Sequence, residues 1–215
     1  MVILKTYSVL CGLLLLALPL RAETIALSQF ATEGLSGWAE KNFYGQTQYS
    51  VVERNGDKVL LAESNNSASA LYKKIRIDLE KTPYLNWSWL VVKHLGDIQE
   101  RQKEGDDYPA RVYVVISGGV FFWKTRAINY VWSSNQPAGS IWPNAYTDNA
   151  QMIALESGSD FLGQWRTEKR NIRTDLRQQF GEDLRYIDGI AVMSDTDNSH
   201  GQALSYYRNL FFSSE

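Results

Sequence analysis

The stretch GDDYPARVYVVISGGVFFWKTRAINYVWSS, residues 105–134, contains two runs of β-branched and aromatic residues separated by a Ser-Gly-Gly segment. β-Branched and aromatic side chains fit the pleated surface of a strand, whereas Ser-Gly-Gly favours a turn. The stretch therefore predicts two strands, Ala110–Ser117 and Val120–Ser133, that can pair with each other in one sheet.

The same pattern continues on both sides of this stretch. Short runs of β-forming residues recur along the chain, separated by segments rich in Gly, Pro, Asn and Asp. The other predicted strands are Thr47–Glu53, Lys58–Ser64, Ala70–Leu79, Tyr84–Val92, Gln151–Glu156, Tyr186–Ser194 and Leu204–Ser213. Such spacing is typical of an all-β fold, and we expect an antiparallel two-sheet β-sandwich. One short helix is expected from Thr174, as its N-cap, to Phe180.

The amino terminus has the pattern of a secretory signal peptide. A positively charged start and a Leu-rich apolar run, Val9–Leu18, precede a plausible cleavage site before Glu23. The run is shorter than the roughly 20 apolar residues that span a bilayer. We expect residues 1–22 to be removed and residues 23–215 to form one domain, in the periplasm or secreted. The only cysteine, Cys11, would leave with the signal, so no disulfide is expected.

Composition and missing motifs argue against several function classes. The chain has 22 Lys and Arg against 24 Asp and Glu, so no overall positive charge favours nucleic-acid binding. It lacks a Gly-x-Ser-x-Gly motif, a P-loop and a dinucleotide fingerprint. The two histidines, His94 and His200, are far apart in the sequence, which disfavours a zinc site. We expect no required cofactor.

Side chains alternate between the two faces of a strand, and this sorts the residues of the two central strands. Arg111 and Tyr113 share one side of the first strand, and Arg126, Tyr130 and Trp132 share one side of the second. If the strands pair, these residues can form one outer face that binds a glycan, because rings stack on sugars and cations pair with carboxylate or sulfate. The alternative is an ordinary solvated face, or one covered by loops.

Two long loops are expected to form the rim of this face. The loop Ser134–Asn149 carries Trp142 and Asn144, and the charged loop Lys93–Tyr108 ends with an Asp-Asp pair. Long loops on a rigid sandwich are frequent sites of function. We therefore predict that both loops contribute to ligand binding.

The same residues leave catalysis open. Asp106 and Asp107 could act as general acid and base, because repulsion between close carboxylates raises the pKa of one of them. A lyase could use Tyr113 as its base and Arg111 to neutralise a uronate, whereas a hydrolase needs two suitably spaced carboxylates, one of them supplied by Asp195. The alternative is structural: the Asp pair binds calcium, or it forms an ion pair with Arg111 that fixes the loop.

A second acidic segment, SDTDNSHG, follows a predicted strand. Asp195, Asp197 and Asn198 place oxygen ligands close together in a tight loop, as a calcium ion requires. No glycine and no distal glutamate follow at the spacing of a calcium-binding loop. Capping of the turn by Asx side chains is the alternative interpretation.

Several segments carry a resemblance to a known family. They are SALYKKIRIDLEKTPYLNWSWLV (69–91), GDDYPARVYVVI (105–116), NYVWSSNQPAGSIWPNAYTDNA (129–150) and DTDN (195–198). Over about residues 30–213, the chain resembles the bacterial family known as domain of unknown function 3047, which implies an exported single-domain protein. The closing ALSYYRNLFFS (203–213) is similar to the last strand of jelly-roll carbohydrate-binding modules. That likeness implies a galactose-binding-like sandwich with a ligand site on a concave face or at a loop edge.

Three functions remain open from the sequence. The first is an exported domain that binds a glycan or another envelope polymer through the aromatic and basic face. The alternative is an enzyme, a lyase or a glycoside hydrolase, that acts on an acidic polysaccharide. The third is an envelope scaffold that binds only protein. An open groove with aromatic side chains would favour binding, and a closed cleft with convergent Asp, Arg and Tyr would favour catalysis.

Overall fold

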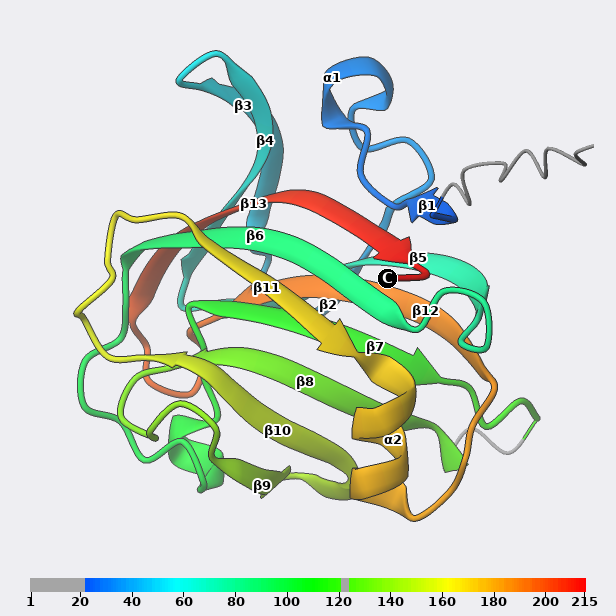
Figure 1. Ribbon diagram of the computed structural model, residues 1–215. Coiled ribbons are helices and arrows are strands. Elements are labelled where there is room, and N and C mark those ends of the chain that lie inside the picture. The colour runs from blue at the N-terminus through cyan, green and yellow to red at the C-terminus, as the bar shows by residue number, and fades with distance from the viewer. Residues whose placement is uncertain (1–21, 121–123) are drawn as a thin grey trace, which may run out of the picture.

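The computed structural model describes residues 22–120 and 124–215, which form two β-sheets packed face to face (Figure 1). The predicted all-β sandwich is therefore confirmed. The predicted signal segment, residues 1–22, lies outside the described residues except for Ala22. Among the residues described, no helix is long and apolar enough to cross a membrane.

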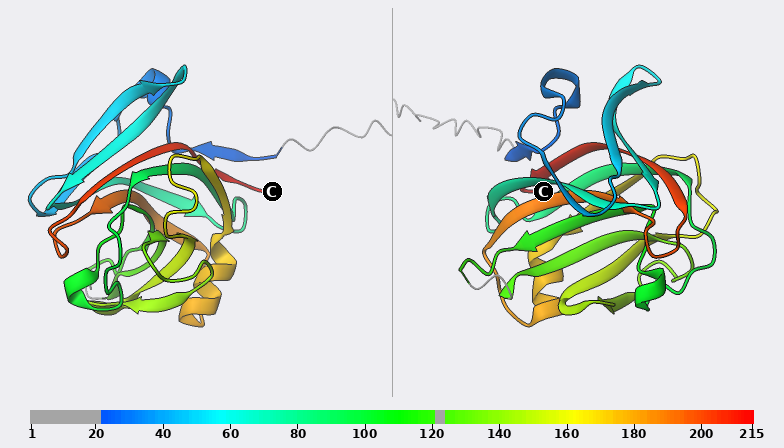
Figure 2. Two further views of the ribbon diagram at one scale, coloured as in Figure 1. Left: turned by 90° about the vertical axis from the view of Figure 1, so that its left-hand side faces the viewer. Right: turned by 180° about the vertical axis from the view of Figure 1, so that it is seen from behind.

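The smaller sheet has six strands. Its order is β11 (Arg166–Asn171), β6 (Tyr84–Lys93), β13 (Gln202–Ser213), β4 (Asp57–Asn65) and β3 (Gln48–Arg54), and β1 (Thr24–Ala26) also pairs with β13. Every pairing in this sheet is antiparallel over the described strands. Figure 2 shows this sheet lying over the larger one, with the β3–β4 hairpin extending beyond it.

The larger sheet has seven strands. Its order is β2 (Ala39–Tyr44), β5 (Ala68–Asp78), β12 (Tyr186–Asp195), β7 (Ala110–Ile116), β8 (Arg126–Ser133), β10 (Thr147–Ser157) and β9 (Ile141–Asn144). Among these strands β8 and β10 pair in parallel, and the other pairings are antiparallel. The expectation of a purely antiparallel sandwich is corrected at this one pair.

The predicted short helix is present as α2, Ile172–Phe180, but it begins earlier than expected. Its N-cap is Asn171, whose side-chain oxygen accepts a hydrogen bond from the Thr174 amide at 3.0 Å. Thr174 therefore lies inside the helix and is not its cap. Gly181 ends the helix with φ of 71°, a conformation that glycine adopts easily. Two further short elements are α1 (Phe30–Glu33) and the 3-10 turn η1 (Lys103–Gly105).

The core between the sheets is built around large aromatic side chains. Trp87 and Trp89 of β6 face Tyr130 and Trp132 of β8, and all four are fully buried. The ring centroids of Trp87 and Tyr130 are 5.4 Å apart, and those of Trp89 and Trp132 are 6.2 Å apart. The tryptophan pair of β6 therefore belongs to the core.

The β7–β8 register corrects the predicted ligand face. Tyr130 lies opposite Val112, and Trp132 lies opposite Ala110, so both aromatics share the inner face of the sheet. Arg111 lies opposite Val131 on the other face. The expected surface of Arg111, Tyr113, Arg126, Tyr130 and Trp132 is therefore not formed, because burial in the core takes the two large aromatics to the inside.

Candidate functional site

The outer face of the seven-stranded sheet carries a groove made of two adjoining cavities. The first, the Arg111 cavity, has a volume of about 470 Å³, and the second, the Lys41 cavity, has a volume of about 650 Å³. Phe43 and Tyr113 line both cavities. Small residues of the sheet line them as well, which leaves room above the strands: Ala68, Ala70, Gly189, Ala191 and Ala150.

Strand register explains how the residues of the groove come together. Arg111 lies opposite Met193 of β12, Tyr113 lies between Ala191 and Asn129, and the neighbouring residues in each strand point inward. The alternation that fills the core thus sends every second side chain to the groove. Arg111 and Tyr113, both predicted ligand residues, lie side by side there, with the guanidinium 4.9 Å from the Tyr113 ring centroid.

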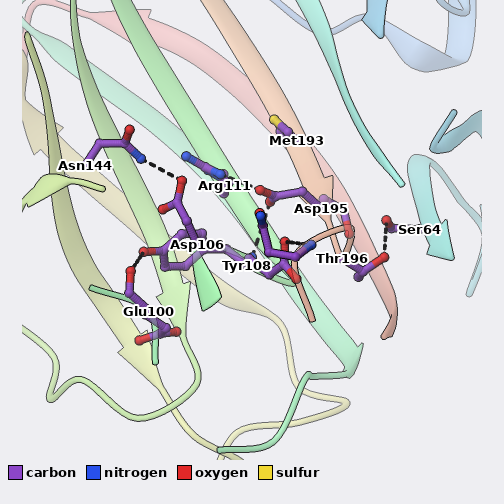
Figure 3. A network of polar contacts seen from close by, with 12 residues as sticks. Ser64, Glu100, Asp106, Tyr108, Arg111, Asn144, Met193, Asp195 and Thr196 are labelled. Atoms are coloured by element: carbon purple, nitrogen blue, oxygen red, sulfur yellow. Dashed lines mark hydrogen bonds and ion pairs between the residues drawn. The ribbon is translucent and has the colours of Figure 1, made fainter. Parts of the chain in front are cut away.

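Arg111 is held by a buried ion pair. Its Nη1 donates to Asp195 Oδ2 at 2.5 Å, and both side chains are about 95% buried or more. Figure 3 shows the guanidinium between Asp195 on one side and Asp106 with Asn144 on the other. Burial lowers the pKa of Arg111, but the neighbouring carboxylates raise it more, so the group stays a cation. The charge of Arg111 is therefore largely compensated within the protein.

The two loops expected to form a rim meet beside the Arg111 cavity. Asn144 Nδ2 donates to Asp106 Oδ2 at 2.8 Å, which joins the end of β9 to the charged loop. Two buried hydrogen bonds fix the charged loop. The Tyr108 hydroxyl donates to the Glu100 carbonyl, and the Glu100 carboxylate accepts from the Ser133 hydroxyl. Burial raises the pKa of Asp106, with Arg111 acting against it.

Several polar atoms beside the Arg111 cavity have no hydrogen-bond partner among the described residues. They are Asp106 Oδ1, Arg111 Nε, and both the nitrogen and the oxygen of the Asn129 side chain. The three residues are at least 95% buried, and all three line this cavity. A buried polar group without a partner costs roughly 1–3 kcal/mol, so such groups usually serve a ligand or hold water.

Aromatic side chains stand at the rim of the groove. Phe43 of β2 is 59% exposed and Tyr146, after β9, is 56% exposed. The Tyr146 hydroxyl accepts from Asn198 Nδ2 at 2.9 Å, so its ring is fixed although it faces solvent. Tyr72 lines the Lys41 cavity. The groove thus combines exposed rings with unpartnered polar atoms.

The remaining predicted ligand residues lie elsewhere. Trp142 is buried under the rim, where its ring packs near Tyr108 at 6.5 Å. Arg126 lies at the start of β8, where it forms an ion pair with Glu182 and stacks over Phe180 at the end of α2. Neither residue lines either cavity of the groove.

The predicted calcium ligands are only partly brought together. Carboxylate oxygens of Asp107, Asp195 and Asp197 lie within 4.8 Å of one another. Burial, and then the Asp107 carboxylate, raises the pKa of Asp197. The side-chain nitrogen of Asn198, Nδ2, donates instead to the Tyr146 hydroxyl. The backbone N–H groups of Asn198 and Ser199 donate to the Asp107 carboxylate. The contacts of Asp107 are those of a turn cap, and the calcium site stays a prediction.

The geometry gives the lyase alternative, and a catalytic role for Asp107, little support. The Tyr113 hydroxyl donates to Met193 Sδ at 3.3 Å, and burial raises the pKa of Tyr113 far above its usual range. A tyrosine acting as a base needs the opposite shift. Arg111, which would have to neutralise a uronate, is already bound by Asp195. Asp107 accepts two backbone amides and does not line the groove.

Comparison with protein families assigns the chain. Residues 36–211 match the family described as "Protein of unknown function (DUF3047)", so the chain belongs to this family. The resemblance noted in the sequence is confirmed. No curated protein matches the chain.

Solved structures similar to this chain include carbohydrate-binding modules and a glycoside hydrolase domain. The family 11 module of cellulase Lic26A-Cel5E from Clostridium thermocellum has 10% identity and a TM-score of 0.43, covering 89% of this chain and 95% of the module. A mutant of the module CBM29-2, complexed with mannohexaose, has 12% identity and a TM-score of 0.43, covering 90% and 93%. The glycoside hydrolase domain of Endo-D from Streptococcus pneumoniae has 11% identity and a TM-score of 0.41, covering 83% and 22%. Likenesses of this size carry no information on the ligand of this chain.

Sequence reasoning missed some residues of the groove. Phe43 and Lys41 lie on β2, a strand of exposed residues that has no apolar alternation. Asn129 carried a signal, because it is the one amide side chain within the otherwise aliphatic and aromatic run AINYVW. A polar residue in the middle of a buried strand is uncommon unless it has a partner.

Proposed function

We propose that this protein binds a glycan in the groove on the outer face of its seven-stranded sheet. The observation that carries the proposal is the set of unpartnered polar atoms of Asp106, Arg111 and Asn129 in the Arg111 cavity. Sugar hydroxyls both donate and accept hydrogen bonds, so they can satisfy a carboxylate oxygen, a guanidinium N–H and a carboxamide at the same time.

The rim supports the same class of ligand. Sugar rings have apolar faces that pack against aromatic side chains, and Phe43 and Tyr146 present exposed rings at the groove. The two cavities adjoin at Phe43 and Tyr113 on the outer face of the sheet. An extended ligand that occupies both cavities fits this shape better than a small compact one.

We also propose that the chain is exported, as the apolar run and the cleavage pattern before Glu23 indicate. The groove would then meet its ligand in the periplasm or outside the cell. Mass spectrometry of the protein from an envelope fraction should find a chain that begins at or near Glu23. Full-length protein recovered from the cytoplasm would contradict export without affecting the groove.

A glycan array followed by titration of the strongest ligand tests the binding proposal. Phe43→Ala and Tyr146→Ala should each weaken binding by about tenfold, because a stacking anchor contributes 1–2 kcal/mol and 1.4 kcal/mol is a factor of ten. Both side chains are exposed, so the fold should remain intact.

Phe161→Ala is the matched control, because Phe161 is an exposed aromatic residue that does not line the groove. An equal loss of affinity in the control, or an array without any bound glycan, would refute the proposal. Incubation of the bound glycan with the protein, followed by analysis for cleavage products, tests the enzymatic alternative.

A further inference from the structure

The Lys41 cavity gathers positive charge from two neighbouring strands. Lys41 comes from β2, and Lys73 and Lys74 come from β5. One acidic residue, Asp188, lines the same cavity. Its Oδ1 accepts from Arg76 Nη1 at 3.1 Å and its Oδ2 accepts from the Ser117 amide at 2.9 Å. The carboxylate of Asp188 is thus already compensated and does not neutralise the lysines.

None of the three lysines forms an ion pair with a carboxylate among the described residues. Lys73 Nζ donates to the Leu27 carbonyl at 3.1 Å, and Lys41 Nζ lies 5.0 Å from the Phe43 ring centroid. Arg126, by contrast, forms an ion pair with Glu182. The Lys73 ammonium is thus engaged away from the cavity, whereas Lys41 and Lys74 place two ammonium groups without a carboxylate partner beside it, and these produce a local positive potential that attracts anions.

The Arg111 cavity, the other half of the groove, has the opposite balance of charge. Asp106, Asp195 and Asp197 line the Arg111 cavity, and its one positive group is Arg111. Because Arg111 is bound by Asp195, this cavity offers an anionic ligand no net attraction. It offers hydrogen-bond acceptors and donors to neutral hydroxyl groups instead. The two halves of the groove therefore favour different chemical groups.

We propose that the ligand is an acidic glycan whose carboxylate or sulfate groups bind in the Lys41 cavity while neutral sugar hydroxyls occupy the Arg111 cavity. The inference rests on the proposed function and adds the charge and the orientation of the ligand. It also moves acid recognition away from Arg111, where the sequence placed it, to lysines that the sequence did not single out.

The test compares polymers that share a backbone and differ in charge. Alginate, polygalacturonate and hyaluronate are each compared with their carboxyl-reduced forms, and dextran sulfate is compared with dextran. At low salt, a charged polymer should bind more tightly than its neutral counterpart. This preference should shrink as the salt rises to about 1 M, where the screening length falls to about 3 Å. Comparison of the preference for the carboxylate polymers with the preference for dextran sulfate shows which anion is recognised.

The variant Lys41→Gln/Lys74→Gln identifies the residues responsible. It should lower the affinity for the charged polymer by up to about fivefold for each lysine removed, which is the range of an exposed ion pair. The affinity for the neutral polymer should not change. Lys58→Gln/Lys81→Gln removes the same charge from exposed positions that do not line the groove, so it controls for net charge. Lys73 is left intact because it binds the Leu27 carbonyl.

The outcomes separate this inference from the proposed function. Binding of neutral glycans without any preference for charged ones, or an equal loss in the two lysine variants, would overturn the acidic-glycan inference alone. No binding to any glycan would overturn the proposed function as well. Retention on phosphatidylglycerol vesicles with no polymer bound would overturn both and assign the lysines to a lipid surface.

Discussion

Both faces of the β7–β8 pair carry fully buried side chains, and these differ in how their polar atoms are satisfied. On the inner face, Trp132 is enclosed and its indole N–H donates to the Gly158 carbonyl at 3.0 Å. On the outer face, Asn129 is just as enclosed, yet neither polar atom of its side chain has a partner among the described residues. The comparison teaches that burial alone does not distinguish a core from a binding site; at Asn129, burial is combined with two unpartnered polar atoms that line a cavity, as a site for a polar ligand requires.

The largest effect is expected on the inner face. Trp132→Ala removes a fully buried indole that packs on Trp89, and it should lower the free energy of unfolding by about 3–5 kcal/mol. Urea denaturation followed by circular dichroism measures this loss. A change below about 1 kcal/mol, the range of ordinary surface substitutions, would place Trp132 outside the core and restore it as a ligand residue.

An intermediate effect tests the acidic cluster at the edge of the outer face. If Asp107, Asp195 and Asp197 bind calcium, the ion at a hundredfold excess over its Kd should stabilise the fold by about 2.7 kcal/mol. The melting temperature of the wild type should then rise with calcium, and that of Asp197→Ala should not. Identical melting curves with calcium and with a chelator would leave turn capping as the role of these residues.

The smallest change in stability is expected at Asn129, together with a clear change in binding. Asn129→Leu replaces an amide without partners by an apolar side chain of similar size, so the free energy of unfolding should change by less than about 1 kcal/mol. Glycan affinity should nevertheless fall by about tenfold, as for loss of a buried binding group. Loss of several kcal/mol of stability would show that the amide is structural and would remove the main support for the groove.

Most of the fold could be predicted from local patterns. The predicted strands Tyr84–Val92 and Tyr186–Ser194 agree closely with β6 and β12, because their apolar residues alternate or form β-branched runs between clear turns. Strands β2 and β11 were missed, since AEKNFY and RTEKRN consist mainly of polar and charged residues at sheet edges. Edge strands are often charged, which hides them from an analysis of hydrophobic patterns.

The candidate site was only partly predictable for a different reason. Loop length assigned Asp106 and Asn144 to the same rim, and strand alternation placed Arg111 and Tyr113 on the same side of one strand; the structure brings both pairs together. Alternation also grouped Tyr130 with Trp132 correctly, but it does not say which side of a strand faces the core. That choice depends on packing against β6, which comes from a distant part of the sequence. The Lys41 cavity depends on the pairing of β2 with β5, so it could not be predicted from local patterns either.

Strand β1 pairs with the end of β13, and the Ser214 amide donates to the Glu23 carbonyl at 3.0 Å. The two ends of the described chain thus leave the molecule side by side from the six-stranded sheet, whereas the groove lies on the outer face of the other sheet (Figures 1 and 2). A fusion partner or a surface linkage at either end would therefore leave the groove accessible. A short linker between the ends would permit circular permutation, with new termini in an exposed turn such as Asn55–Gly56 of the β3–β4 hairpin.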